Sequence, residues 1–293
     1  MPGISVSTRL CAVIGDPVGH SLSPVMHNAA FEAAGLDYVY LAFEVKDVGA
    51  CAAGMRALPS FEGLSVTIPH KTAIMEHMDA IDPMAARVGS VNTVARDGAR
   101  LIGLTTDGPG ALKAFTDAGE DLGGREVLFT GAGGAVRAVV FAVAELAQPA
   151  GVTILGRNAA KARTLAEEAA EKTGVPVRGG ALDRDLEDAM AKADAIVQGT
   201  PVGMHPNPGE SCVPAELLRP EQVVFDMVYR PHKTQLLQDA ETKGCTIIVG
   251  IEMLVNQAEL QFERWTGQAP PAGVMRAAAL DALGVTGDGA ARR

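Results

Sequence analysis

The segment Gly63–Lys71 contains a threonine hydroxyl and a lysine amine at a spacing that could serve proton-transfer chemistry. Its apolar, β-branched run (Gly63–Thr67) stops just before Pro69, which predicts a short strand that ends in a turn. The turn would present the hydroxyl of Thr67 beside the amine of Lys71, a set able to hold and protonate an oxygen of a polar substrate. An isolated lysine is usually exposed, so the segment alone also fits an ordinary lysine in the first turn of the next helix.

A glycine-rich turn follows a second apolar run. Val127–Phe129 is predicted as a strand, residues 131–134 are Gly-Ala-Gly-Gly, and Ala135–Leu146 is predicted as a helix. Strand, glycine turn and helix in this order are the context of a dinucleotide-binding fingerprint. The helix start would offer unpaired N–H groups to a pyrophosphate. Because the third small position of the fingerprint is Val136, a plain tight turn stays an alternative.

The next predicted strand, Val152–Leu155, is followed by a basic segment. NAD sites carry an acidic residue here that binds the ribose hydroxyls. In this chain Arg157, Asn158 and Lys161 follow instead, with no acid among them. An acid would repel a 2′-phosphate, whereas Arg157 can bind it with two N–H groups and stack on the adenine. The pattern favours NADP(H) over NAD(H), and the alternative is that both cations are solvated surface residues.

Two serines stand between a predicted strand (Leu10–Gly15) and a predicted helix (Pro24–Ala34). Hydroxyls such as those of Ser21 and Ser23, placed at a helix start, favour an anion. Ser23 alone is explained as an N-cap followed by proline at the first helical position. Ser21 is then a surplus hydroxyl, and the segment leaves an anion pocket and a plain cap both open.

Three further polar residues stand where apolar patterns end or are interrupted. Asn92 and Asp107 each follow an apolar run, where such residues are most often turn formers. Gln257 lies within an otherwise apolar helical pattern (Met253–Trp265), where a glutamine often marks only the solvent face. None of the three indicates a site by itself.

Composition excludes several classes of function. The 293 residues are 47% hydrophobic, and the net charge of −10 comes without any Lys/Arg cluster, which argues against a nucleic-acid partner. The four cysteines show no CxxC spacing and the six histidines no HExxH pattern, so we expect neither disulfides nor a metal site. No run of 18 apolar residues and no leader pattern occurs, so we expect no membrane partner and a cytoplasmic location.

The order of the predicted elements indicates an α/β protein with two βαβ series. The first series has strands at 10–15, 38–44 and 63–67, with helices at 24–34 and 48–58. The second has strands at 127–129, 152–155, 195–197, 223–225 and 246–249, with helices at 135–146 and 159–172. Two last helices, at 253–265 and 271–283, come after the second series and are expected to pack back onto the first.

We therefore predict two domains with a cleft between them. A discontinuous parallel-sheet substrate domain would comprise residues 1–105 and 250–293, and a Rossmann-like dinucleotide-binding domain would comprise residues 106–249. The sequence leaves open whether the protein is a monomer or a homodimer.

Taken together and in this order, the motifs resemble those of the shikimate/quinate dehydrogenase family over about residues 10–283. The family's SxSP serines match Ser21 and Ser23, and its N-V-T-x-P-x-K motif matches Ser65–Lys71. Its other motifs match Gly89–Thr93, Thr105–Gly110, Gly131–Arg137, Gly156–Asn158, Gln198–Met204, Asp226–Pro231 and Gly250–Gly267.

The resemblance implies NADPH-dependent, reversible reduction of 3-dehydroshikimate to shikimate in the biosynthesis of chorismate and the aromatic amino acids. It implies Lys71 and Asp107 as the catalytic pair. The implied substrate residues are Ser21, Ser23, Thr67, Lys71, Asn92, Asp107, Tyr229 and Gln257. The implied cofactor residues are Gly131, Ala132, Gly133, Gly134, Ala135, Arg157, Asn158, Lys161, Met227 and Gly250.

The sequence departs from the family pattern at three positions. Ser65, Thr105 and Gln198 each replace an asparagine of the family motifs. The departures leave Lys71 and Asp107 in place, so they bear on substrate preference and fine geometry more than on reaction class. Two alternatives follow: a quinate/shikimate dehydrogenase that uses NAD, and a catalytically silent paralogue that binds a dinucleotide.

Overall fold

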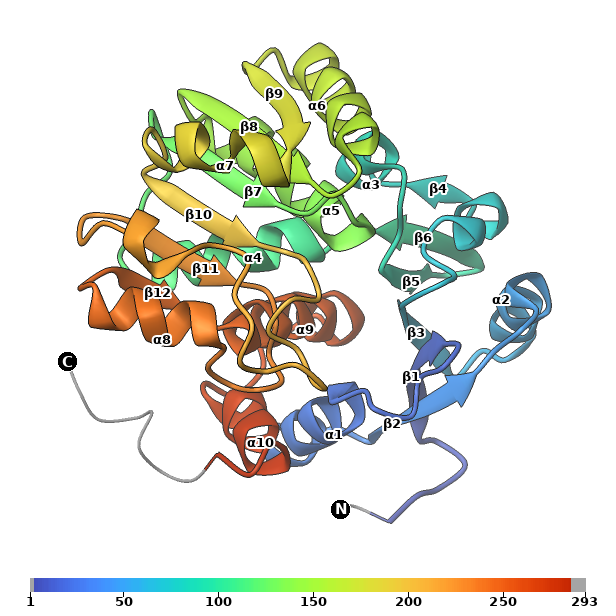
Figure 1. The fold of residues 1–293 in the computed structure, drawn as a ribbon. Helices are drawn as coiled ribbons and strands as arrows, with labels where there is room; N and C mark the ends of the chain where they lie inside the picture. The colour runs from blue at the N-terminus through green and yellow to red at the C-terminus, as the bar shows by residue number, and fades with distance from the viewer. Residues whose placement is uncertain (1–2, 286–293) are drawn as a thin grey trace. The chain divides into compact units, whose positions relative to one another are not determined.

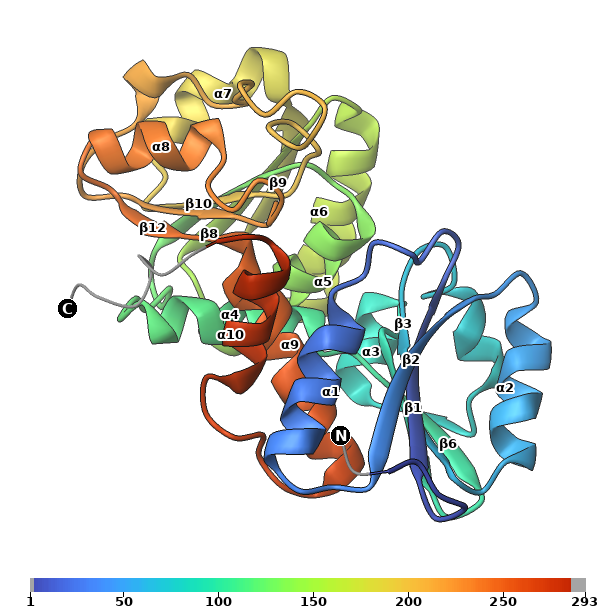
Figure 2. The same ribbon diagram turned by 90° about the horizontal axis from the view of Figure 1, so that it is seen from below.

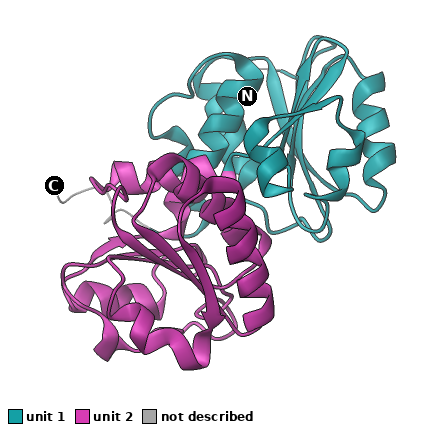
Figure 3. Ribbon diagram, turned by 90° about the horizontal axis from the view of Figure 1, so that it is seen from above, with its two compact units in different colours: residues 1–106, 255–293 teal, residues 107–254 magenta. Residues whose placement is uncertain are grey.

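The structure, a computed structural model, describes residues 3–285 and divides the chain into two compact units (Figure 3). Unit 1 comprises residues 1–106 and 255–293, and unit 2 comprises residues 107–254. The first stretch of unit 1 thus ends at 106 where the sequence pattern suggested 105, and unit 2 ends at 254 where it suggested 249. Each unit is built around one six-stranded sheet.

The sheet of unit 1 is mixed, with strand order β2-β1-β3-β5-β6-β4. Its strands are β1 (Arg9–Gly15), β2 (Tyr38–Glu44), β3 (Phe61–Val66), β4 (Ala80–Ile81), β5 (Thr93–Asp97) and β6 (Arg100–Leu104). The α/β class is confirmed, but β5 is antiparallel to both of its neighbours, so the sheet is not parallel throughout. β5 and β6 form a hairpin with the two-residue loop Gly98-Ala99, and Gly98 has a φ of +60°, which suits a glycine at the first position of such a turn.

Helices from both ends of the chain cover unit 1. They are α1 (Ser23–Ala33), α2 (Val48–Ala57), α3 (Pro83–Val88), α9 (Gly250–Thr266, in unit 1 from Val255 onward) and α10 (Val274–Ala282), with a 3-10 turn η1 (Ala73–His77). As expected, the C-terminal helices pack on the first series, and α1 and α10 lie side by side (Figure 2). Trp265 of α9 donates to the Val94 carbonyl at 3.0 Å, and any side chain at Gly63 would collide with its ring.

An aromatic stack in the core of unit 1 contains a buried histidine. The ring of His27 stacks on Tyr40, with ring centroids 4.4 Å apart, and tilts against Trp265. Neither ring nitrogen of His27 has a hydrogen-bond partner among the described residues. Burial lowers the pKa of His27 to about 3. The nearby side chain of Gln261 opposes part of this shift, although it makes no hydrogen bond with the ring.

His27 should make folding acid-sensitive. Below its unfolded pKa of about 6.5, the unfolded chain takes up a proton that the folded protein refuses until about pH 3, so stability falls as the pH falls. We expect His27→Phe to lose roughly 2 kcal/mol less stability than wild type between pH 6.5 and 4.5. Urea unfolding followed by fluorescence of Trp265, the only tryptophan, measures this. His205→Asn, which removes an exposed histidine, is the control, and parallel curves for His27→Phe and wild type would contradict the prediction.

The sheet of unit 2 is parallel throughout, in the order β12-β11-β10-β7-β8-β9 (Figure 1). Its strands are β7 (Glu126–Thr130), β8 (Gly151–Gly156), β9 (Val177–Ala181), β10 (Ala195–Gln198), β11 (Val223–Asp226) and β12 (Thr246–Ile248). Its helices are α4 (Asp107–Asp117), α5 (Gly134–Ala142), α6 (Ala159–Thr173), α7 (Leu182–Met190) and α8 (Gln235–Thr242), with short η2 (Val143–Ala147) and η3 (Ala215–Leu217). The strand order reverses between β7 and β10, and in such sheets ligands bind at the carboxyl ends of the strands beside that reversal. This order is of the Rossmann type, which confirms the predicted fold class of this domain, although β9 was not among the predicted strands.

Within residues 3–285, none of the helices combines the length and the apolar character needed to cross a membrane. The same residues contain no group of three or more His, Cys, Asp or Glu side chains arranged to hold a metal ion.

Candidate functional site

A pocket of about 460 Å³ opens at the carboxyl ends of β7, β8 and β10 in unit 2. Six of the predicted cofactor residues line it: Gly131, Ala132, Gly133, Arg157, Asn158 and Lys161. Gly131 has a φ of +101°, which a residue with a side chain rarely adopts, and Gly133 is the N-cap of α5. The turn therefore directs the first N–H groups of α5 toward the pocket, as binding of a pyrophosphate requires.

The basic edge of this pocket follows β8. Arg157 and Lys161 are exposed, and neither makes an ion pair within the described part of the chain. Asn158 is the N-cap of α6, where its Oδ1 accepts from the Lys161 backbone N–H at 3.0 Å. Two cations without an ion pair, at the edge of a pocket whose lining contains no acidic residue, fit a dinucleotide that carries a phosphate on its ribose. Asp183 and Glu187 lie on a neighbouring cavity that Arg157 also lines.

Val136, which breaks the glycine fingerprint, has a compensating partner in the structure. Its side chain is buried at the start of α5, and any side chain at Gly199 would collide with it. The close approach that a small residue on the helix usually permits is supplied here by a glycine after β10. Gly199, Thr200 and Pro201 complete the pocket.

A buried glutamine holds the loop that follows β10. The Nε2 atom of Gln198 donates to the carbonyls of Thr200 and Val202, each at 3.1 Å, and its Oε1 accepts from the Thr200 N–H. Gln198 also contacts Asp226, whose pKa is raised to about 6 by burial against the opposing hydrogen bonds of Thr234 and others. Gln198 thereby shapes the wall of the pocket without lining it.

The remaining predicted cofactor residues lie beside the pocket, not in its lining. Gly134 and Ala135 form the exposed first turn of α5. Met227 follows β11, and its sulfur lies near Gly199. Gly250 is the first residue of α9, and a side chain at this position would collide with the Val228 carbonyl. Their part in cofactor binding therefore stays a prediction.

In unit 1, the predicted substrate residues gather at one edge of the sheet. Thr67 follows the carboxyl end of β3, and Ser21 follows that of β1. Because β5 is antiparallel, Asn92, which precedes it, reaches the same edge, as does Thr106 after β6. The antiparallel strand, which the sequence pattern did not predict, therefore places Asn92 at this edge.

The loop that carries Lys71 is fixed at both ends. The Thr67 N–H donates to the Ile14 carbonyl at 2.9 Å, and the Val91 N–H donates to the Lys71 carbonyl at 2.8 Å. Between them a ring nitrogen of His70 contacts the Val45 carbonyl at 2.6 Å. The backbone of this loop is therefore held in place, and Lys71 is half-buried.

Asn92, Thr106 and Gln257 are joined by hydrogen bonds and are all more than nine-tenths buried. The Asn92 Nδ2 atom donates to Thr106 Oγ1 at 3.0 Å, and Thr106 Oγ1 donates to Gln257 Oε1 at 3.4 Å. The structure thus places Gln257 in a buried polar cluster and not on a solvent face. Thr106, which sequence reasoning did not single out, links the two predicted amides.

The other predicted substrate residues are placed as follows. Ser21 Oγ accepts from the Ser23 N–H at 3.2 Å, and the N-cap of α1 is Leu22, so the N-cap explanation of Ser23 is wrong. Asp107 is the buried first residue of α4. Tyr229 follows β11 in unit 2 and is half-buried, and burial raises the pKa of its hydroxyl.

Comparisons with known proteins decide the family. Residues 13–94 match the family described as "Shikimate dehydrogenase substrate binding domain", and residues 250–280 match "Shikimate 5'-dehydrogenase C-terminal domain". A shikimate dehydrogenase (NADP(+)) from Moorella thermoacetica is 41% identical over 98% of this chain and 98% of its own. The chain belongs to the shikimate dehydrogenase family.

Two further members extend the comparison. A shikimate dehydrogenase (NADP(+)) from Thermococcus kodakarensis is 46% identical over 94% of this chain and 97% of its own. The crystal structure of the Listeria monocytogenes shikimate 5-dehydrogenase with shikimate and NAD has a TM-score of 0.90 at 38% identity, covering 94% of this chain and 98% of that one.

The three departures from the shikimate dehydrogenase motifs differ in their surroundings. Gln198 shapes the cofactor pocket, as described above. Ser65 is buried and hydrogen-bonded to Tyr40 and Gln261. Thr105 has a buried hydroxyl without a hydrogen-bond partner among the described residues, and nothing in the structure explains this substitution.

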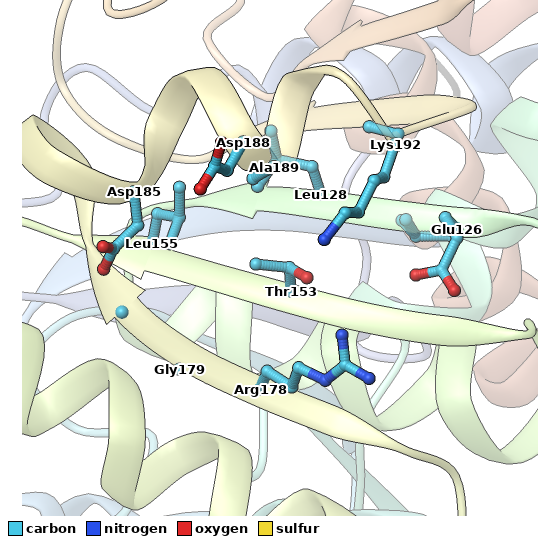
Figure 4. Close-up of a pocket in the computed structure, with 13 residues that line it drawn as sticks. Glu126, Leu128, Thr153, Leu155, Arg178, Gly179, Asp185, Asp188, Ala189 and Lys192 are labelled. Carbon is cyan, nitrogen blue, oxygen red and sulfur yellow. The ribbon is translucent and has the colours of Figure 1, made fainter.

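A separate cavity of about 330 Å³ lies on the face of the unit 2 sheet, over β7, β8 and β9 (Figure 4). Arg178 and Lys192 extend toward Thr153 there, with Glu126 to one side. None of the residues predicted for substrate, cofactor or catalysis lines this cavity. Dinucleotides bind at the strand ends in sheets of this kind, so we do not assign the cavity to the shikimate dehydrogenase reaction.

Proposed function

We propose that this protein is a shikimate dehydrogenase that interconverts 3-dehydroshikimate and shikimate with NADP(H). The observation that carries the proposal is identity above 40%, over nearly the whole chain, to curated NADP(+)-dependent shikimate dehydrogenases. The reaction makes the protein an oxidoreductase acting on a CH–OH group, with a place in the shikimate pathway toward the aromatic amino acids.

Lys71 and Asp107 carry the proton in this proposal. In the direction of reduction, hydride addition to the ketone carbon leaves negative charge on the oxygen, which the Lys71 ammonium stabilises and protonates. In the direction of oxidation, the neutral amine accepts the hydroxyl proton as the hydride leaves. Asp107 orients the amine and the same hydroxyl.

The remaining substrate roles are those that the resemblance to the family implies. Ser21 and Ser23 donate hydrogen bonds to the substrate carboxylate, and Tyr229 is assigned to the same group. Thr67, Asn92 and Gln257 bind the ring hydroxyls. The clustering of Ser21, Thr67 and Asn92 at one sheet edge supports this assignment.

The nicotinamide cofactor supplies the hydride when it is bound. The glycine turn and the start of α5 would hold its pyrophosphate, and Arg157 with Lys161 would hold the 2′-phosphate. We place the enzyme in the cytoplasm as a monomer or homodimer, and size-exclusion chromatography with light scattering distinguishes the two oligomeric states.

Four initial rates test the function: reduction of NADP⁺ and of NAD⁺, each with shikimate and with quinate. We expect the highest kcat/KM with NADP⁺ and shikimate, because the basic pocket edge favours a 2′-phosphate. A preference for NAD⁺ and quinate would identify the NAD-dependent alternative. No activity in any combination, for folded protein that binds NADP⁺, would identify a silent dinucleotide-binding paralogue.

A further inference from the structure

A chain of buried hydrogen bonds runs through unit 1 behind the proposed substrate residues. It begins at Tyr40 on β2, whose hydroxyl donates to Ser65 Oγ at 2.6 Å. Ser65 Oγ donates to Gln261 Oε1 on α9 at 2.8 Å, and Gln261 Nε2 donates to Thr93 Oγ1 at 2.9 Å. All four residues are less than 9% exposed, so no bulk water competes for these bonds.

The second half of the chain reaches two proposed substrate residues. Thr93 Oγ1 donates to Asn92 Oδ1 at 2.8 Å, and Asn92 Nδ2 donates to Thr106 Oγ1 at 3.0 Å. Thr106 Oγ1 then donates to Gln257 Oε1 at 3.4 Å. Each hydroxyl between Tyr40 and Gln257 therefore accepts one bond and donates one.

Two backbone groups fix the direction of this chain. The Thr106 N–H, which can only donate, lies 2.8 Å from Asn92 Oδ1, so this atom is the amide oxygen. The Asn92 carbonyl, which can only accept, lies 3.4 Å from Gln261 Nε2, so this atom is the amide nitrogen. Reversing the Asn92 amide would place two N–H donors against each other, and reversing the Gln261 amide would place two oxygen acceptors against each other.

The orientation of Gln257 follows from these constraints. The Asn92 Oδ1 atom already accepts from the Thr106 N–H and the Thr93 hydroxyl, which occupies both of its lone pairs. The Thr106 hydroxyl hydrogen is therefore directed to Gln257 Oε1 in preference to Asn92. Gln257 then turns the N–H side of its amide away from Thr106.

We propose that Gln261 and Ser65 are positioning residues that fix the amide orientation of Gln257 through the Thr93 and Thr106 hydroxyls. The inference rests on the proposed function, in which Gln257 binds a ring hydroxyl. With its oxygen bonded to the buried chain, the Gln257 amide directs its N–H side to the substrate. Without Gln261, the Thr93 hydroxyl can turn away from Asn92 Oδ1, and the Thr106 hydroxyl can then donate to that atom, 3.3 Å away. Gln257 thereby loses the bond that holds its orientation, whereas Asn92 stays held by the Thr106 N–H.

Gln261→Met tests this, because it keeps most of the side-chain volume and removes both polar atoms. We expect the KM for shikimate to rise about tenfold, with the KM for NADP⁺ changed less than twofold. The matched control is Gln222→Met, which removes a fully buried glutamine from unit 2 that bonds the Met190 and Ala193 carbonyls. The control should keep both KM values near wild type.

Two further variants guard against misfolding and against a merely structural role. Ser65→Ala removes the same link with a smaller change and should raise the KM for shikimate in the same selective way. In Gln261→Glu the protonated carboxyl can donate as Nε2 does, whereas the carboxylate cannot. Its KM for shikimate, relative to wild type at the same pH, should therefore rise with increasing pH.

The outcomes separate this inference from the proposed function. An active wild type whose Gln261→Met variant has an unchanged KM for shikimate would overturn the positioning role alone. Equal increases in the KM for shikimate and for NADP⁺ would overturn it too, because they would indicate general loosening. A wild type that turns over no shikimate would overturn the proposed function, and the positioning role with it.

Discussion

Replacing Lys71 by alanine is expected to lower the kcat for shikimate oxidation by about 10²–10⁴-fold with little change in KM. In the proposed mechanism the amine acts where charge changes on the reacting oxygen, whereas the hydroxyl and amide groups proposed for binding hold the rest of the substrate. Steady-state kinetics with NADP⁺ and shikimate measure the split between kcat and KM. The loss should appear in both directions, because one amine donates and accepts the same proton.

Lys243→Ala is a suitable control for this experiment. It removes an exposed lysine after α8 in unit 2, and it changes the net charge by the same amount. We expect wild-type kcat for this variant. A Lys71→Ala variant with near-wild-type kcat would exclude the proton-transfer role, and one with only a raised KM would reduce Lys71 to a binding residue.

The sequence was most informative where the physical signal is local. The strand that ends before Pro69 and the start of the helix that follows the glycine turn lie within two residues of the predicted bounds, because turn chemistry and apolar periodicity are properties of short segments. The end of that helix was predicted less well, because α5 ends at Ala142 and the short η2 continues to Ala147. The hairpin loop Gly98-Ala99 also had a local signal, its glycine at the first turn position, which the analysis of apolar runs did not use. As a result, the antiparallel direction of β5 was not predicted, and the position of Asn92 depends on that direction.

The buried polar chain could not be predicted in the same way. Ser65 and Gln261 are 196 positions apart, and only the packing of α9 on the sheet of unit 1 brings them together. One weak signal existed: Gln261 lies four residues after Gln257, so both stand on one face of the helix. Likewise, Gly199 meets Val136 only because β10 pairs with β7.

The double variant Arg157→Gln/Lys161→Gln is expected to raise the KM for NADP⁺ about 10- to 100-fold and to change the KM for NAD⁺ only a few-fold. A hydrogen bond to a charged group contributes about 1.5–3 kcal/mol to binding. Only NADP⁺ carries a 2′-phosphate, so only NADP⁺ loses such bonds in this variant. Both side chains are exposed at the pocket edge, so the substitutions leave the packing of α6 intact. The ratio of kcat/KM for the two cofactors, measured at saturating shikimate, gives the effect directly.

A matched pair of cations separates contact from net charge. Arg178→Gln/Lys192→Gln removes the same two charges from the cavity over β7, β8 and β9, which no predicted cofactor residue lines (Figure 4). If Arg157 and Lys161 act by contact with the 2′-phosphate, the control keeps the wild-type ratio of kcat/KM. If they act only through their long-range electrostatic potential, both double variants should weaken NADP⁺ binding by the same factor. Added salt should then weaken NADP⁺ binding to the wild type by a similar factor. Equal losses with NADP⁺ and NAD⁺ would instead place these cations on the pyrophosphate, which the two cofactors share.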